Sequence, residues 1–419
     1  MLDYADTPYE YFPPRPSRFW IGLFKLYNRF VYLPGAELRI RGVDVSCDPG
    51  WEQLSPEARR RCLFVPNHGT HADPQLLMET LRQQRCTSCF MAAYDVFQRD
   101  AFRAWIMQRS GAFSVDREGS DKQAMKTALE ILKAGQYGLT VFAEGNVYLQ
   151  NDRVTPFLDG TAFIGLKAQK ELGADHPVYV IPVSMKATHA RDDAREVILQ
   201  HLRELAEVVG TELDSGVPIA TELERIGILL LHQILERKEM GIALPDGLSL
   251  PERLDRVAEH LIAALETAMA VTPREGEGLL NRFRKLRRDI HQIRLDPEKA
   301  DQHEQAASWA VDAILAFRVL SYSGDYLGES PSLDRVGETV EKLCEDHYSR
   351  QMAPFGIRQG LVHLGAPIDL RDWMDRYAKA GRQAMQDLTS EMKQRVQAGL
   401  DLLNAGNRHP GGRPFGVEA

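Results

Sequence analysis

The chain has 419 residues, of which 44% are hydrophobic and 26% charged, a composition typical of a globular protein with two or three domains. It carries 51 lysines and arginines against 59 aspartates and glutamates, and the resulting net charge of −8 gives no electrostatic reason to expect nucleic acid as a partner. The five cysteines form no even-numbered disulfide framework, which indicates a reducing compartment. The sequence has no uncharged apolar run of 18 residues and no secretory-signal pattern, so we expect a cytoplasmic protein.

The first fifty residues contain an aromatic segment, residues 19–33, in which Lys25, Asn28 and Arg29 interrupt an otherwise apolar run. A helix of this composition can lie in the headgroup layer of a membrane without spanning it. It can equally pack against the core of the protein, because an amphipathic pattern does not say what its apolar face touches. We predict that residues 1–50 form an interfacial segment and that the protein associates peripherally with the inner face of the membrane.

Residues 51–190 alternate short apolar runs with helical patterns. This alternation predicts an α/β fold, a mixed sheet flanked by helices. The predicted strands are 62–66, 111–115, 139–142 and 178–183. The predicted helices are 74–83, 101–108, 122–133 and 160–170.

Residues 191–354 consist of long charged helical patterns separated by glycine and proline, which predicts an all-helical insertion. The predicted helices are 193–209, 219–240, 251–271, 278–294, 302–320 and 332–349. The helix at 278–294 is basic and amphipathic, which fits either a bundle member with a solvated charged side or a face that binds phospholipid or an acidic carrier.

Residues 355–404 are predicted to return to the α/β core as a strand at 360–364 and a long helix from residue 369 to about 403. The last segment, residues 405–419, is rich in glycine and proline. We predict a disordered tail there.

The segment Asn67-His68-Gly69-Thr70-His71-Ala72-Asp73 falls between a predicted strand and a predicted helix, where catalytic loops commonly lie. A strand that leads into a helix can bring His68 into contact with Asp73. A carboxylate on one imidazole nitrogen fixes the tautomer and stabilises the imidazolium, as a general base requires. A helix-capping aspartate beside a surface histidine has the same spacing, so this motif alone leaves both interpretations open.

Three further blocks follow in order: Gly111-Ala112-Phe113-Ser114-Val115-Asp116-Arg117, Phe142-Ala143-Glu144-Gly145 and Val180-Ile181-Pro182-Val183. With the first block they resemble, in order and spacing, the glycerolipid acyltransferase family whose best known members acylate 1-acylglycerol-3-phosphate. The late segment Gly365-Ala366-Pro367-Ile368 resembles the one with which that family closes its sheet.

The resemblance implies transfer of a fatty acyl group from acyl-CoA or acyl-carrier protein to the hydroxyl of a glycerolipid-type acceptor. This acceptor is either a lysolipid, such as lysophosphatidate, or glycerol-3-phosphate. It gives His68 the role of general base and Asp73 that of orienting it. The substrate-binding residues that it implies are Asn67, Arg117, Glu144 and Gly145. Such chemistry needs an activated alcohol and donors for the oxyanion, but neither a metal nor an organic cofactor.

The block Phe142–Gly145, third of the four, departs from the family. The family usually continues Gly-Thr-Arg-Ser where this chain has Gly145 followed by Asn146, Val147 and Tyr148. The missing arginine is expected to help hold the acceptor phosphate, because two arginines provide bidentate, charge-assisted bonds. Arg153 could substitute for it. Alternatively, the acceptor is another lysolipid or an alcohol without a terminal phosphate.

Two other function classes stay open. A metal-dependent hydrolase could use His68, His71 and Asp73, although the His-x-His-x-Asp-His spacing of metallo-β-lactamase-like enzymes would put ligands at Gly69 and Pro74. A catalytically silent lipid-binding scaffold is the other class, and the intact His68 and Asp73 argue against it.

Overall fold

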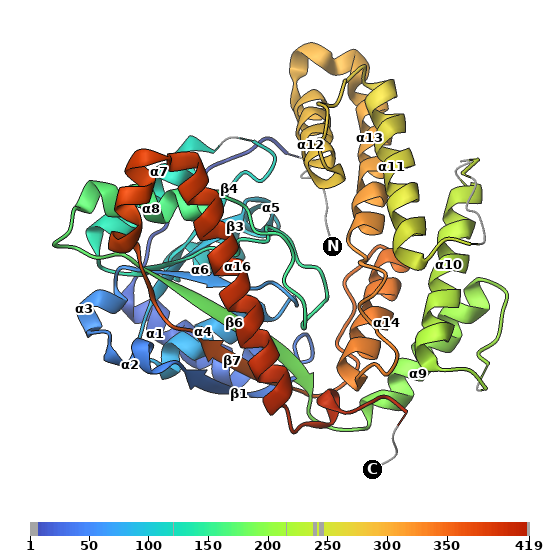
Figure 1. The fold of residues 1–419 in the computed structure, drawn as a ribbon, viewed down its shortest axis with the longest axis horizontal. Helices are drawn as coiled ribbons and strands as arrows, with labels where there is room; N and C mark the ends of the chain where they lie inside the picture. Colours follow the sequence, from blue (N-terminus) through green and yellow to red (C-terminus); the bar gives the residue numbers. More distant parts are fainter. Residues whose placement is uncertain (1–6, 120, 215, 238–240, 243–246, 417–419) are drawn as a thin grey trace. The chain divides into compact units, whose positions relative to one another are not determined.

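The computed structural model describes residues 7–416 except 120, 215, 238–240 and 243–246. The chain divides into two compact units. The core unit comprises Tyr9–Ala194 and Ala353–Arg413, and the helical unit comprises Arg195–Met352 together with the two chain ends. Figure 1 shows the helices and strands of both units.

One sheet of eight strands forms the centre of the core unit, in the order β1-β7-β6-β2-β5-β3-β4, with β8 also paired to β6. Its strands are β1 (Ile40–Cys47), β2 (Cys62–Pro66), β3 (Ser88–Ala93), β4 (Ala112–Val115), β5 (Gly138–Thr140), β6 (Tyr179–His189), β7 (Arg358–Leu364) and β8 (Ile368–Asp369). Neighbouring strands are parallel except that β6 runs antiparallel to β7 and β8. The mixed, mostly parallel sheet agrees with the predicted fold class.

Helices cover both faces of this sheet (Figure 1). They are α1 (Arg18–Tyr27), α2 (Pro49–Gln53), α3 (Pro56–Arg59), α4 (Asp73–Gln83), α5 (Asp95–Gln98), α6 (Ala101–Arg109), α7 (Lys122–Ala134), α8 (Gly160–Leu172), α15 (Met374–Lys379) and α16 (Gly381–Gly406). Strand β2 is buried on both sides, with Leu63 and Val65 in the cluster under α7, α8 and α16, and Phe64 in the cluster under α4. Alternate residues of a strand face opposite sides, so a strand covered by helices on both faces is apolar throughout.

Sequence patterns located β2, β4, β5, β6, α4, α6, α7 and α8 but missed β1, β3 and the short helix α5. Both strands lie toward the outside of the sheet, and β1 alternates apolar with polar residues such as Asp44 and Ser46, which weakens its apolar signal. Strand β6 extends six residues past its predicted end at Val183 because it pairs with β7 as far as His189, although several of the added residues are polar. Since β1 belongs to the sheet, the predicted boundary at residue 50 differs from the structure.

The segment that precedes α1 lies along β4, the last strand of the sheet. The Ser114 N–H donates to the Phe12 carbonyl at 3.1 Å, and the Phe12 N–H donates to the Ser114 hydroxyl at 2.8 Å. Further along, the Arg15 N–H donates to the Gln108 carbonyl at 2.9 Å. Residues 12–15 therefore cover an edge that would otherwise expose unpaired backbone groups.

The helical unit contains six α-helices in its described part: α9 (Ala194–Val208), α10 (Ile219–Arg237), α11 (Leu250–Ala268), α12 (Leu279–Leu295), α13 (His303–Leu320) and α14 (Leu333–Tyr348). The predicted end of α10, at residues 238–240, lies outside the described residues. On the basic helix α12, Arg282 pairs with Glu259 and Glu266 of α11, and Lys285 pairs with Glu277. These contacts fit a bundle member, two of whose cations are paired within the unit.

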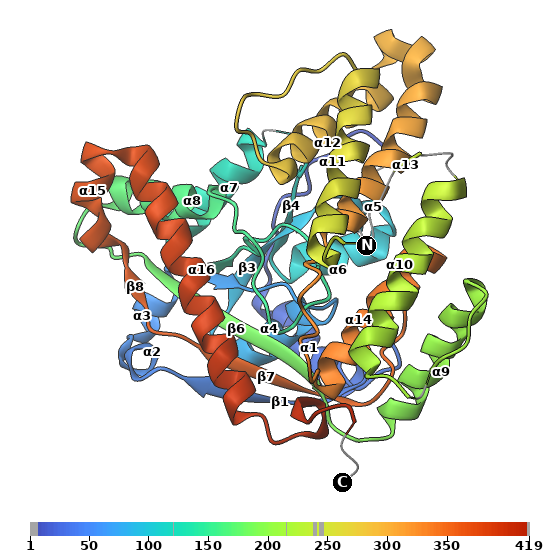
Figure 2. The same ribbon diagram turned by 45° about the vertical axis from the view of Figure 1, so that its right-hand side comes forward.

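The chain end differs from its prediction in two ways. The long C-terminal helix is interrupted at Ala380, whose φ of −148° and ψ of 65° separate α15 from α16 (Figure 2). Residues 405–416 are ordered rather than a disordered tail, with Phe415 buried and its N–H donating to the Pro331 carbonyl at 2.9 Å. Residues 417–419 lie outside the described residues.

Candidate active site

His68 lies in the histidine loop, residues 67–72, between β2 and α4. Its Nδ1 is 3.0 Å from Oδ2 of Asp73, the first residue of α4. The Asp73 carboxylate is fully buried and also accepts the Thr70 backbone N–H at 2.9 Å and the Thr70 hydroxyl at 2.8 Å. A carboxylate beside Nδ1 holds the proton there and leaves Nε2 as the basic nitrogen. Thr70, to which sequence reasoning gave no role, therefore completes the support of the pair.

The imidazole of His68 is mostly covered. Its ring centroid lies 4.3 Å from that of Phe142, and its side chain is 17% exposed. The ring is therefore largely shielded from water, while part of it stays accessible.

Glu144 joins the histidine loop to the long loop, residues 141–159, between β5 and α8. Its Oε1 accepts the backbone N–H of His68 at 2.6 Å, and its Oε2 accepts the N–H of Thr155 at 2.9 Å and the Thr155 hydroxyl. Burial raises the pKa of the Glu144 carboxyl, while these hydrogen bonds lower it. Gly145 follows with a φ of 76°, where a Cβ would lie 3.1 Å from Leu158. Both oxygens of Glu144 therefore bind the protein's own loops.

Asn67 is buried and attached to β6. Its Nδ2 donates to the Met185 carbonyl at 2.9 Å, and its Oδ1 accepts the Met185 N–H at 2.7 Å. The sequence placed Asn67 among the substrate-binding residues. In the structure both polar atoms of its side-chain amide are hydrogen-bonded to the backbone of β6.

Arg117 lies in the loop between β4 and α7 and contacts the long loop. Its Nη2 donates to Asp95 Oδ1 at 3.1 Å, and its Nη1 approaches Asn146 Oδ1 at 3.4 Å. Asn146 follows Gly145, where the chain lacks the family's Thr-Arg-Ser continuation, and sequence reasoning gave it no role. The structure thus brings Arg117 next to this departure, while Arg153 lies half-buried further along the long loop.

The described residues offer no other obvious reactive centre. No three of their histidine, cysteine, aspartate and glutamate side chains are grouped so that they could hold a metal ion, and His68, His71 and Asp73 form no such group. All five thiols are free, and burial raises the pKa of each, that of Cys89 and Cys344 to about 12. Thiols with raised pKa values make poor nucleophiles at neutral pH.

The geometry suits removal of a proton from a hydroxyl by His68 Nε2, with Asp73 stabilising the imidazolium that forms. Comparison with known families agrees with this chemistry: residues 50–186 match the acyltransferase family model. This range contains His68, Asp73, Arg117 and Glu144. A search of the curated proteins finds no match to the chain.

Proposed function

We propose, because residues 50–186 match the acyltransferase family model, that the protein transfers a fatty acyl group from acyl-CoA or acyl-carrier protein to the hydroxyl of an anionic glycerolipid-type acceptor, lysophosphatidate or glycerol-3-phosphate. The observation that carries the proposal is the 3.0 Å contact between His68 Nδ1 and the buried Asp73 carboxylate. This contact leaves Nε2 free to act on a hydroxyl.

In the proposed reaction, His68 Nε2 takes the hydroxyl proton while the acceptor oxygen attacks the thioester carbonyl carbon. The C–S bond of the resulting tetrahedral intermediate then breaks, which releases the ester and the donor thiolate. The imidazolium returns its proton to the sulfur. Asp73 stabilises the imidazolium between these steps, and no acyl-enzyme forms.

Arg117 is the proposed contact for the acceptor headgroup. A guanidinium carries five N–H donors, and the contacts to Asp95 and Asn146 orient it through two of them. The remaining donors suit a phosphate or another anionic oxygen. Arg153, on the long loop, is the proposed second cation.

We also propose that the protein attaches to a membrane surface through α1 and the short π-helix that follows it, Asn28–Tyr32. Phe19 is 71% exposed and Phe30 66% exposed, and Leu23, Leu26, Tyr27 and Val31 are also exposed. The patch continues onto α6, because Trp20 contacts Trp105, which stacks on the exposed Phe102. Exposed aromatic residues interrupted by cations such as Arg29 suit the headgroup layer. No helix in the described ranges is long and apolar enough to cross a membrane.

The proposal is tested with the purified full chain, each of the two thioester donors, and separate acceptors: lysophosphatidate, glycerol-3-phosphate, an uncharged lysolipid and a long-chain alcohol. Thiol release is followed together with mass-spectrometric detection of the lipid product. An acylated anionic acceptor is the expected result. Thioester hydrolysis without a lipid product would indicate a hydrolase, and vesicle binding without turnover would indicate a scaffold.

A further inference from the structure

Strand β6 has an edge that β2 covers only in part. β2 pairs with β6 from Tyr179 to Val183, whereas β6 continues to His189. Beyond β2, the Asn67 amide pairs with Met185 as described above. The Asn151 amide then pairs with Ala187, its Nδ2 donating to the carbonyl at 3.2 Å and its Oδ1 accepting the N–H at 3.4 Å. Two side-chain amides thus continue the ladder where the neighbouring strand stops.

These two amides attach different loops to the same strand edge, two residues apart. Asn67 belongs to the histidine loop, and Asn151 belongs to the long loop. The loops also touch: a Cβ placed on Gly69 would lie 3.1 Å from Asn151 Cα and 3.1 Å from its Oδ1. In addition, the Tyr148 N–H donates to the His68 carbonyl at 3.4 Å. The long loop therefore packs directly on the backbone around His68.

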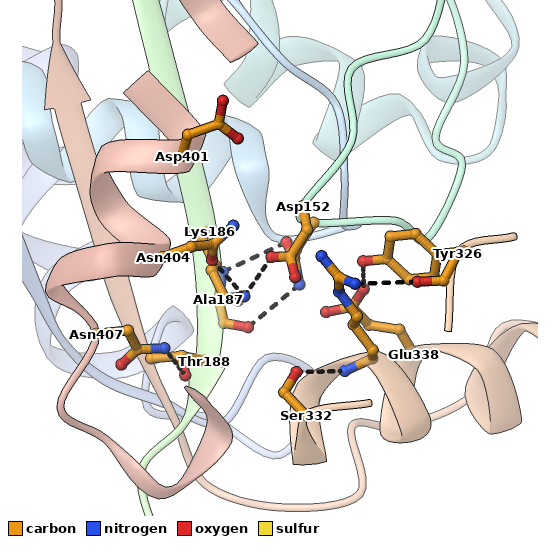
Figure 3. A network of polar contacts seen from close by, with 12 residues as sticks. Asp152, Lys186, Ala187, Thr188, Tyr326, Ser332, Glu338, Asp401, Asn404 and Asn407 are labelled. Carbon is orange, nitrogen blue, oxygen red and sulfur yellow. Dashed lines mark hydrogen bonds and ion pairs between the residues drawn. The ribbon is translucent and has the colours of Figure 1, made fainter. Parts of the chain in front are cut away.

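A second set of contacts attaches the long loop to β6 and α16 (Figure 3). Asp152 forms a buried ion pair with Lys186 of β6, and Lys186 Nζ also donates to Asn404 Oδ1 of α16 at 2.9 Å. Gln397 of α16 donates to the Asp152 carbonyl at 3.0 Å and accepts the Val154 N–H at 2.9 Å. The backbone on both sides of Arg153 is therefore bound to elements far away in the sequence.

We propose that Asn151 is a positioning residue for His68, and that Asp152, Lys186 and Gln397 hold Asn151 in the place where it supports the histidine loop. The inference rests on the proposed function, since it gives His68 a reaction to perform. Asn151 acts by fixing the backbone at Gly69 and so the direction of Nε2. A base displaced by about 1 Å can lose roughly a hundredfold in rate, although every catalytic group is still present.

The test compares Asn151→Ala with Asn407→Ala under varied donor and acceptor concentrations. Asn407 is a matched control, because its amide also binds β6, donating to the Thr188 hydroxyl at 2.9 Å, but from the segment after α16. We expect Asn151→Ala to lower kcat by about thirtyfold to a hundredfold and to leave both KM values within about threefold. Asn407→Ala keeps the wild-type kcat. Circular dichroism and thermal unfolding establish that both variants fold.

Gly69→Ala perturbs the contact between Gly69 and Asn151 from the side of the histidine loop, and it removes no hydrogen bond. Its added methyl group pushes on the backbone of Asn151, so kcat falls with little change in KM. If both substitutions act through one contact, the loss in the double variant is smaller than the product of the two single losses. Gly69→Ala also provides the answer should Asn151→Ala fail to fold.

The outcomes separate the two proposals. Wild-type turnover that disappears in His68→Ala but stays within threefold of normal in both Asn151→Ala and Gly69→Ala overturns the positioning role and keeps the proposed function. An equal loss of kcat in Asn407→Ala also overturns the positioning role, because any weakening of β6 would then suffice. Absence of acyl transfer by the wild-type protein with every donor and acceptor overturns the proposed function, and the positioning role with it.

Discussion

The histidine loop and the long loop meet along the part of β6 that β2 leaves uncovered, but they are held in opposite ways. The contacts that orient His68 within the histidine loop span three to five residues, from Thr70 or His68 to Asp73. The contacts of the long loop reach 36 residues from Asn151 to Ala187 and 245 residues from Asp152 to Gln397. A short motif thus orients the proposed base through local contacts, whereas distant parts of the chain hold the loop that packs against it.

The largest effect is expected within the histidine loop. Asp73→Asn puts an amide NH2 donor where the carboxylate now accepts hydrogen bonds from His68 and Thr70. It therefore favours the wrong imidazole tautomer, and kcat should fall by about a thousandfold or more. Thr70→Val removes one of the three donors and should lower kcat only by roughly tenfold. Steady-state thioester turnover measures both. Equal losses in the two variants would contradict the view that Asp73 acts mainly through His68.

For the long loop, we expect substitutions to lower the stability of the protein. Lys186→Met removes one partner of the buried ion pair with Asp152, and such a loss typically lowers the free energy of unfolding by about 3–5 kcal/mol. Adding Asp152→Asn also removes the carboxylate charge and should restore part of the loss. Urea unfolding of both variants measures the difference. If Lys186→Met alone unfolds like the wild type, the ion pair does not anchor the long loop.

Arg117 lies between Asp95 and Asn146 and is the proposed contact for the acceptor headgroup. Lysine offers a point charge in place of a planar fork, so Arg117→Lys should raise the acceptor KM by about tenfold and leave the thioester KM nearly unchanged. Kinetics with each substrate varied in turn decide this. An effect on the thioester side alone, or no effect, would point to an uncharged acceptor alcohol.

The smallest effect is expected at the exposed aromatic patch. Phe19→Ser combined with Phe30→Ser should reduce binding to anionic vesicles severalfold, because each ring loses buried apolar area in the headgroup layer. Leu402→Ser is a matched control, since Leu402 is 56% exposed on α16, outside the patch. Vesicle sedimentation compares them. These substitutions are preferable to deletion of residues 1–33, which would also remove the segment that covers β4.

The sequence predicted the contact between His68 and Asp73 because both lie on one short strand–loop–helix unit. It could not predict the partners of Asn151, since these depend on how far β6 extends beyond β2. One signal was present: Ser184, Lys186 and Thr188 continue the alternation of a buried strand with polar residues. A lysine in such a place needs a buried anion, but the sequence does not say which of many acidic residues supplies it.

The central claim, that His68 is the base of an acyl transfer, is tested most directly by comparing His68→Ala with His71→Ala in acyl transfer to the preferred acceptor, with and without a metal chelator. We expect His68→Ala to lose at least about a hundredfold in kcat, His71→Ala to stay near the wild type, and the chelator to have no effect. Comparable losses in both variants, together with loss of wild-type activity on chelation, would contradict the account and indicate metal-dependent hydrolysis.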